Sequence, residues 1–179
     1  SRMDKYDINR IDKRSDSDSV VARYLFDALK HSKRGDVDAA SEQLGMAKEC
    51  SPDYYEVHRV EAFIHSRHGN PVGAMSAYEA AIELNPRSPI IRYYYGSFLL
   101  RQGRVDRARE QLLAARVYDP EPGPVFIELA RSHLYLQEWD KASELLLPFV
   151  ENSAVDRLSE KRMRIAWDLY LQVYLSFLN

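Results

Sequence analysis

The sequence is poor in the residues that build turns and crosslinks. Of its 179 residues only 7 are glycine, 8 are proline and one, Cys50, is cysteine. A chain with so little turn-forming material is not expected to form a many-stranded sandwich or barrel, and a lone cysteine cannot form an internal disulfide. These scarcities predict an all-α protein and exclude a disulfide-stapled miniprotein.

A large net charge and a long hydrophobic run are also missing. Lys and Arg number 25 against 27 Asp and Glu, so the formal net charge is −2 and any nucleic-acid binding must rest on a local patch. The longest apolar-rich stretch, 165–178, is interrupted by polar residues and is shorter than the roughly 20 residues that span a bilayer. Residues 1–18 are charged throughout and lack the apolar core of a signal peptide. We therefore expect a soluble, cytoplasmic protein with no membrane partner.

What the sequence does contain is a repeat of 34 residues. Small residues, a glycine and a proline recur at this interval. The recurring positions are Ala28, Ala62, Gly96 and Ala130; Ala40, Ala74, Ala108 and Ala142; Ala47, Ala81 and Ala115; Gly35, Gly69 and Gly103; and Pro52, Pro86 and Pro120. Apolar residues within each unit are spaced three and four apart, as on a helix, and the glycine is a helix end. Each unit is therefore predicted to be two antiparallel helices that approach closely at the small residues.

Two dipeptides predict where helices begin. In Asn70-Pro71 and in Ser88-Pro89 the first residue can accept a hydrogen bond from the unpaired amides of the first turn. The proline has no amide to leave unpaired. We expect Asn70 and Ser88 to be N-caps and the prolines to be the first helical residues.

The pattern of small residues at unit positions 8, 20 and 27, glycine at 15 and proline at 32 resembles the tetratricopeptide repeat (TPR) family. The resemblance covers Val21 to about Asp156 and implies a right-handed α-α superhelix, a TPR solenoid, of about four helix-turn-helix repeats: 21–54, 55–88, 89–122 and 123–156. The last repeat is degenerate, because Gln137 and Ala154 replace the glycine and the proline. Pro148 lies inside its second helix and is expected to kink that helix or end it early.

The two ends of the chain lie outside the repeats. Residues 1–19 are expected to form a polar extension; the start at Ser-Arg-Met suggests that Ser1 and Arg2 are a cloning remnant and that the chain is a piece of a longer protein. Residues 155–179 predict a C-terminal capping or association helix. Its apolar residues surround more of the circumference than one neighbour can bury. We expect an association surface at Trp167, Leu171, Tyr174 and Leu175. A second copy of the chain, the rest of a longer polypeptide, or the open end of the solenoid would cover this surface.

No motif in the sequence indicates catalysis. There is no HExxH, no cysteine cluster, and no GxxxxGK[ST], GxGxxG or GxSxG. Three of the five histidines, His31, His65 and His133, share unit position 11, which favours packing between paired helices over chemistry. We expect no catalytic residue, no metal and no cofactor, and hence not an enzyme.

TPR geometry implies that a concave groove is lined by first-helix positions. We expect the ligand-groove residues to be Arg59, Phe63, Arg67, Tyr93, Tyr94, Arg101, Arg131 and Tyr135. Guanidiniums can hold a carboxylate or phosphate while the aromatic rings supply rigid contact area. Lys33, Arg67 and Arg101 equally suit the helix dipole, because each precedes a helix-ending glycine. The lysine and asparagine of the chaperone-tail clamp are replaced by Leu25 and Leu29, so a chaperone tail is not expected.

The leading hypothesis is a non-catalytic protein-protein interaction scaffold that binds an acidic peptide or protein segment in the groove. One alternative is a regulatory or sensor TPR region of a larger NTPase or transferase. A weaker alternative is an RNA-binding solenoid, which the net charge of −2 disfavours. Self-association through the C-terminal helix would add a homodimer to the partners.

Overall fold

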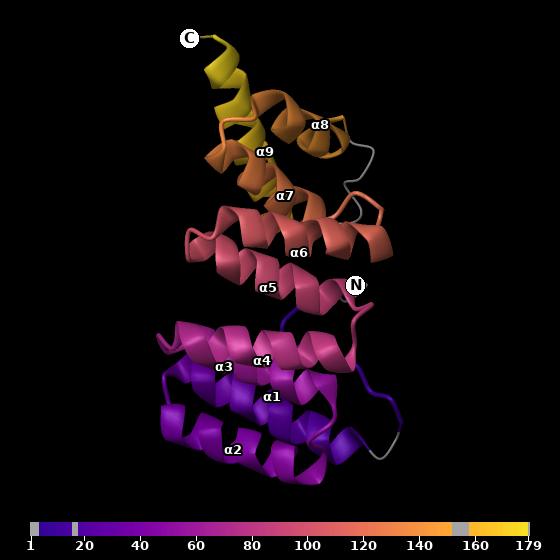
Figure 1. The fold of residues 1–179 in the computed structure, drawn as a ribbon, viewed down its shortest axis with the longest axis vertical. Helices are drawn as coiled ribbons and strands as arrows, with labels where there is room; N and C mark the ends of the chain where they lie inside the picture. The colour runs from indigo at the N-terminus through magenta and orange to yellow at the C-terminus, as the bar shows by residue number, and fades with distance from the viewer. Residues whose placement is uncertain (1–3, 16–17, 152–157, 179) are drawn as a thin grey trace. The chain divides into compact units, whose positions relative to one another are not determined.

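The computed structural model describes residues 4–15, 18–151 and 158–178, and helices account for all of their regular secondary structure. Within these ranges lie α1 (Asp18–Arg34), α2 (Val37–Cys50), α3 (Tyr55–Arg67), α4 (Pro71–Leu84), α5 (Pro89–Arg101), α6 (Val105–Tyr118), α7 (Pro124–Tyr135), α8 (Trp139–Val150) and α9 (Glu160–Phe177) (Figure 1). The all-α prediction is confirmed.

The chain divides into two compact units. The N-terminal unit is Lys5–Ile91, and the C-terminal unit is Arg92–Asn179 together with Ser1–Asp4. In the N-terminal unit α1 packs on α2 and α3 packs on α4, with further contacts from α3 to α1 and α2. In the C-terminal unit α7 packs on α6 and α8, and α9 packs on α8 and α7. Neighbours in sequence are therefore neighbours in space within each unit.

The recurring small residues are the points of close helix contact. All of the alanines of the two most regular positions are completely buried: Ala28, Ala62, Ala130, Ala40, Ala74, Ala108 and Ala142. At Gly96 a Cβ atom would come within 2.6 Å of Leu112 Cγ and 3.3 Å of the Ala108 carbonyl oxygen. Because a real Cβ does not approach a neighbour so closely, α5 and α6 can pack at this distance only without a side chain at residue 96.

The turns between paired helices use a left-handed residue. Gly35, Gly69 and Gly103 have φ of 84°, 75° and 72°, and Gln137 adopts φ of 57° at the fourth turn. The predicted caps also form: the Asn70 side chain accepts from the Gly73 amide at 2.9 Å and Ser88 Oγ accepts from the Ile91 amide at 3.3 Å. Both N-cap predictions are confirmed. Gln137 carries a strain that the three glycines avoid.

The three histidines at unit position 11 link the first helix of their own pair to the start of the second. His31 Nδ1 lies 3.5 Å from Asp36, His65 Nδ1 lies 3.1 Å from Asn70 Nδ2, and His133 Nδ1 lies 2.7 Å from Glu138.

In each pair the partner is the residue at the N-cap of the second helix. Their role is structural, as expected, but it is a polar link across the turn rather than the packing of an aromatic substitute.

The last helices follow a less regular path. Pro148 lies inside α8, which ends two residues later at Val150. Ser1, Arg2, Ala154, Asp156 and the predicted start of the terminal helix at 155 lie outside the described residues. The Ser159 hydroxyl oxygen caps α9 by accepting from the Arg162 amide at 3.4 Å, and Ala166, Leu169 and Val173 form its buried side. Of the helices described, none combines the length and the apolar character needed to cross a bilayer.

Candidate functional site

Arg59, which was expected on an open groove lining, is among the largest completely buried side chains of the described residues, with an exposed fraction of 0%. Its guanidinium donates to Glu56 Oε2, with Nη2 at 2.5 Å and Nε at 2.8 Å, and Nη2 also donates to the carbonyl oxygen of Arg10 at 2.9 Å. Burial raises the pKa of Glu56, and the Arg59 charge opposes that rise. The expectation of exposure is wrong here, because an ion pair and a chain segment from outside the repeats enclose the side chain.

That segment is 5–15, which runs before α1 and is drawn in indigo in Figure 1. Lys33 Nζ donates to Asn9 Oδ1 at 2.5 Å, and the Tyr55 hydroxyl donates to Asp12 Oδ2 at 3.2 Å. The Arg14 guanidinium stacks 4.4 Å above the ring centre of Tyr54. We call Lys33, Tyr54, Tyr55 and Arg59, which the segment contacts, together with Phe63 of α3, the α1/α3 face.

Apolar contacts hold the same segment. Ile8 and Ile11 pack, partly buried, against the hydrophobic core of the N-terminal unit, as does Phe63 of the α1/α3 face. Tyr6 is 1% exposed. The extension was expected to be a polar one, but three large apolar or aromatic side chains withdraw from water there. The expected groove residue Phe63 packs against the same core and is partly buried.

Arg67 serves the end of α1. Its Nε donates to the carbonyl oxygen of Ser32 at 3.1 Å and its Nη2 to that of Lys33 at 3.2 Å. The last carbonyls of a helix have no partner within the helix, so a cation there satisfies both hydrogen bonding and the helix dipole. The structure brings Arg67 to the first helix of the preceding pair rather than to an open groove.

The C-terminal unit places the other predicted groove residues around a buried carboxylate. Glu128 lies 3.6 Å from Arg131 Nη2 within α7. Burial raises the pKa of Glu128, while the guanidiniums of Arg131 and of Arg101 act in the opposite direction. Both arginines also act on the phenol of Tyr93, whose pKa burial raises. Tyr93, Arg101 and Arg131 thus form one charged and aromatic cluster between α5 and α7.

The two arginines of this cluster reach solvent, whereas Tyr93, which was expected on an open groove lining, is buried with an exposed fraction of 9%. Arg131 has a side-chain exposure of 33%, Tyr135 of α7 is 60% exposed, and Arg101 is exposed. The Nε of Arg131 is buried and has no hydrogen-bond partner among the described residues. We call Tyr93, Arg101, Arg131 and Tyr135 the α5/α7 face. Tyr94 adjoins it, because its ring meets that of Tyr93 edge-on at 5.1 Å between centroids.

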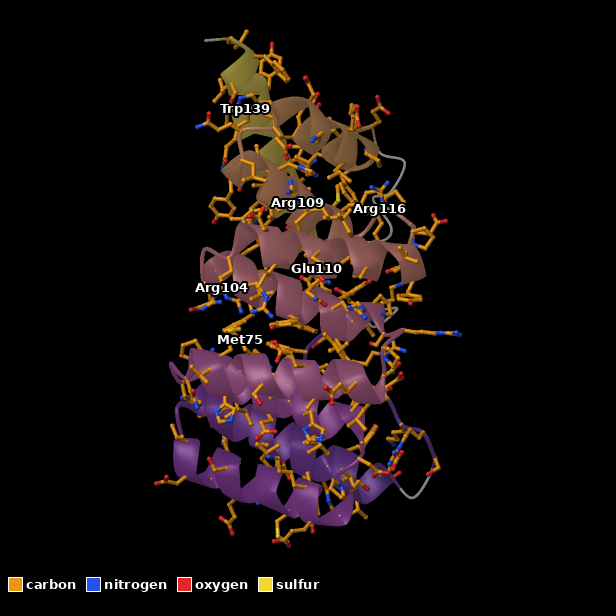
Figure 2. The ribbon with its side chains drawn as sticks, viewed as in Figure 1. Met75, Arg104, Arg109, Glu110, Arg116 and Trp139 are labelled. Atoms are coloured by element: carbon orange, nitrogen blue, oxygen red, sulfur yellow. The ribbon has the colours of Figure 1, made fainter. Side chains whose placement is uncertain are left out.

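Other cations of the C-terminal unit are occupied by structural contacts. Arg109 and Arg116 lie on the side of α6 that faces α7 (Figure 2). Arg109 pairs with Glu138 at 3.3 Å and Arg116 stacks over the Phe126 ring at 4.7 Å. Hydrogen bonds from Lys141 and His133 lower the pKa of Glu138 to about 2. These arginines fasten the helices to each other and are not placed for a ligand.

Like Glu138, the carboxylate of Glu61 links two helix pairs, here through a contact between α3 and α2 of the N-terminal unit. Glu61 accepts from Lys48 Nζ at 2.5 Å and lies 3.6 Å from both His58 and His65. Burial acts to raise the pKa of Glu61, but hydrogen bonds from His58 and Lys48 outweigh it and lower the pKa to about 2. In the described residues, no group of three or more His, Cys, Asp or Glu side chains is arranged to hold a metal ion.

An open basic pocket of about 350 Å³ lies in the N-terminal unit. Its lining is Asn9, Phe26, Lys30, Lys33 and Arg34. The three cations come from the last turns of α1, where they also suit the helix dipole. This pocket is not apparent from the sequence, because Asn9, which forms one wall, reaches α1 only through the fold.

The predicted association surface on α9 is exposed. Trp167, Leu171, Tyr174 and Leu175 have exposed fractions of 47%, 54%, 54% and 49%. The opposite side of the helix, by contrast, packs on α7 and α8. The helix therefore buries one side within the C-terminal unit and presents the other, apolar side to solvent.

Antiparallel helix pairs that recur every 34 residues define an α-helical repeat protein. Residues 62–122 match the family model described as tetratricopeptide repeat. Over these residues the chain is similar to tetratricopeptide repeat proteins, and the predicted all-α superhelical repeat fold is confirmed by its likeness to solved structures.

Three such structures illustrate the likeness. PilF of Pseudomonas aeruginosa is 24% identical, with a TM-score of 0.70 over 89% of this chain and 78% of that one. A thermophilic TPR protein of Thermus thermophilus is 18% identical, with a TM-score of 0.68 over 88% and 82%. A mutant O-GlcNAc transferase of Thermobaculum terrenum is 21% identical, with a TM-score of 0.66 over 78% of this chain but only 27% of the transferase. No curated protein sequence matches the chain.

Proposed function

We propose that the chain is a protein-interaction scaffold that binds an acidic peptide or protein segment on the α5/α7 face. The observation that carries this proposal is the state of Arg131, whose Nε is buried without a hydrogen-bond partner in the described chain while the side chain stays 33% exposed. A carboxylate or phosphate can accept from a guanidinium at two oxygens and would satisfy this group. Tyr135 supplies adjoining aromatic area.

The electrostatics of the face support an anionic ligand. Two arginines, Arg101 and Arg131, surround one buried carboxylate, Glu128. One of these two positive charges therefore has no carboxylate partner at the cluster among the residues that the structure describes. An acidic residue of a bound segment would supply it, and its binding would weaken as salt screens the attraction.

Binding is tested with a panel of fluorescent acidic peptides, with and without a phosphorylated residue. Arg101→Gln with Arg131→Gln should weaken binding of the best peptide at least about tenfold, which is the loss of roughly 1.4 kcal/mol of charge-assisted contact. Arg164→Gln on α9, where the side chain is 76% exposed, removes the same charge from another helix and should leave affinity unchanged. If no acidic peptide binds, or if the double variant binds like the parent, the proposal fails.

A second copy of the chain is the proposed partner of the α9 surface. Trp167, Leu171, Tyr174 and Leu175 are each about half exposed on one helix. Each large apolar side chain that becomes buried contributes on the order of 1.5–3 kcal/mol, and two-fold pairing places the same surface on both chains. Light scattering should show a dimer that Trp167→Glu with Leu171→Glu dissociates. Val72→Glu with Val117→Glu, at scattered exposed valines, is the matched control. A parent that is monomeric at every concentration overturns this proposal.

The likeness to a transferase of which the chain spans 27% supports one other candidate, a TPR region within a larger enzyme. The full open reading frame tests this candidate, because it either encodes a flanking catalytic domain or does not.

The single cysteine, Cys50, is exposed, and a free exposed thiol supports the expected cytoplasmic location, where thiols stay reduced.

A further inference from the structure

The segment 5–15 contacts the N-terminal unit as a bound peptide would. The regular secondary structure of this unit consists of α1 to α4, whereas the segment itself contains only turns. Its turn at Asp7 is closed by its own atoms, since the Asn9 amide donates to Asp7 Oδ1 at 2.8 Å and the Arg10 amide to the Asp7 carbonyl at 3.0 Å. Part of the local shape of the segment is therefore fixed by its own atoms rather than by the helices.

Three side chains of the α1/α3 face form hydrogen bonds with the segment. Arg59 donates to the backbone carbonyl of Arg10, and Tyr55 donates to the carboxylate of Asp12. Lys33 donates to the side-chain oxygen of Asn9. In each of the three hydrogen bonds the α1/α3 face supplies the donor and the segment supplies the acceptor. The face is thus built to receive acceptor groups spaced along a short stretch of chain.

Two isoleucines, one before these contacts and one among them, anchor the segment. Ile8 and Ile11 are three residues apart and both pack against the hydrophobic core of the unit. Because burial of apolar surface is the main attraction between chain segments, the anchors hold the segment on the unit and the hydrogen bonds fix its register. An apolar residue, a second one three positions later and an acidic residue directly after it make up the recognised pattern.

We propose that the α1/α3 face is a peptide-binding surface and that the chain's own segment 5–15 is its tethered ligand. The surface accepts a partner peptide with the Ile-x-x-Ile-Asp pattern only when the segment has left it. A tether of this length holds the segment at an effective concentration on the order of millimolar, so the free surface is a minor state. The segment and its face belong to the N-terminal unit, so their test is independent of the α5/α7 face.

The test uses the full chain and a fluorescent synthetic peptide of the sequence Asp4–Ser15. In the chain, Ile8→Asp with Ile11→Asp removes both anchors of the tethered segment and leaves the α1/α3 face unchanged. Fluorescence anisotropy should then show the peptide binding at least about tenfold more tightly than to the parent chain, because the tethered competitor is gone. The same peptide carrying both aspartates should not bind either chain.

A matched control and a milder variant make the result decisive. Val37→Asp with Val72→Asp adds the same charge at exposed positions of the same unit and should bind the peptide like the parent. If the Ile8→Asp, Ile11→Asp chain does not unfold cooperatively, Ile8→Ala with Ile11→Ala replaces it. That variant should also bind the peptide more tightly than the parent, but by a smaller factor. A folded variant that binds the peptide no better than the parent overturns the proposal.

Discussion

Replacing Arg59 by alanine tests the burial of its ion pair. Glu56 is only 3% exposed, and the change leaves its carboxylate without a cation. The change also removes the hydrogen-bond donor to the Arg10 carbonyl. Removing one partner of a buried pair costs about 3–5 kcal/mol, because the remaining charge stays out of water uncompensated. We expect Arg59→Ala to lower the free energy of unfolding by about that amount, measured by urea denaturation with far-UV circular dichroism.

Arg131→Ala is the matched comparison. Arg131 also pairs with a glutamate three residues earlier, but at 3.6 Å and with a side-chain exposure of 33%. A partly solvated pair at that distance contributes about 0–1 kcal/mol, so this variant should lose no more than that. Both tryptophans, Trp139 and Trp167, belong to the C-terminal unit, so their fluorescence follows the Arg131 variant while circular dichroism follows both.

A double variant separates the lost charge from the lost packing. Glu56→Leu combined with Arg59→Leu removes both charges and keeps apolar volume, so it should recover at least half of the stability that Arg59→Ala loses. If Arg59→Ala costs no more than Arg131→Ala, the guanidinium is solvated in solution and the arrangement around segment 5–15 is refuted.

Three further predictions concern stability. Gln137→Gly should raise the free energy of unfolding by about 0.5–1 kcal/mol, because it removes a left-handed glutamine. Gly103→Gln should lower it by about 1 kcal/mol, because the glutamine must adopt the left-handed conformation even though an added Cβ meets nothing within 4 Å. Urea denaturation measures both changes. Ala108→Leu should lower the melting temperature through a loss of about 1–3 kcal/mol, because the completely buried alanine has no room for a larger side chain. Glu61 stabilises the fold at pH above its ordinary pKa of 4.5, and this contribution should disappear as pH falls toward 2, with a slope of at most about 1.4 kcal/mol per pH unit.

Each of these has its own check. If Gln137→Gly and Gly103→Gln are both as stable as the parent, the left-handed conformation at these two turns costs a glutamine nothing and the prediction is wrong. For Ala108, Ala114→Leu on the partly buried side of the same helix should cost less. For Glu61, the difference in stability between parent and Glu61→Gln should shrink with falling pH, and a difference that stays constant contradicts the lowered pKa.

The repeat architecture could be predicted from the sequence because its determinants are local. A glycine that ends a helix, an Asn-Pro start and an alanine facing a partner helix act within one helix pair, and the 34-residue period shows them again and again. The bounds of α4 and α5 follow these signals to the residue, at Pro71 and Pro89. The exposed apolar side of α9 was also visible from the spacing of Trp167 and Leu171.

The candidate site could be predicted only in part, because the register gives the face of a helix but not what covers it. On α7 the register places Arg131 and Tyr135 at a partly open surface. On α3 the same reasoning places Arg59 on a lining, yet a carbonyl 49 residues away in sequence reaches its guanidinium. Repeat periodicity contains no information about segment 5–15, which belongs to no repeat.

The sequence by itself therefore determined the helix pairs, their turns and their close contacts, since each depends on residues at most a repeat apart. The tertiary structure alone decided which cations are available. A guanidinium is stable in the core only where a carboxylate and further acceptors surround it. Whether such groups arrive depends on chain distant in sequence, which is why Arg59 is withdrawn into the N-terminal unit while Arg101 and Arg131 remain accessible.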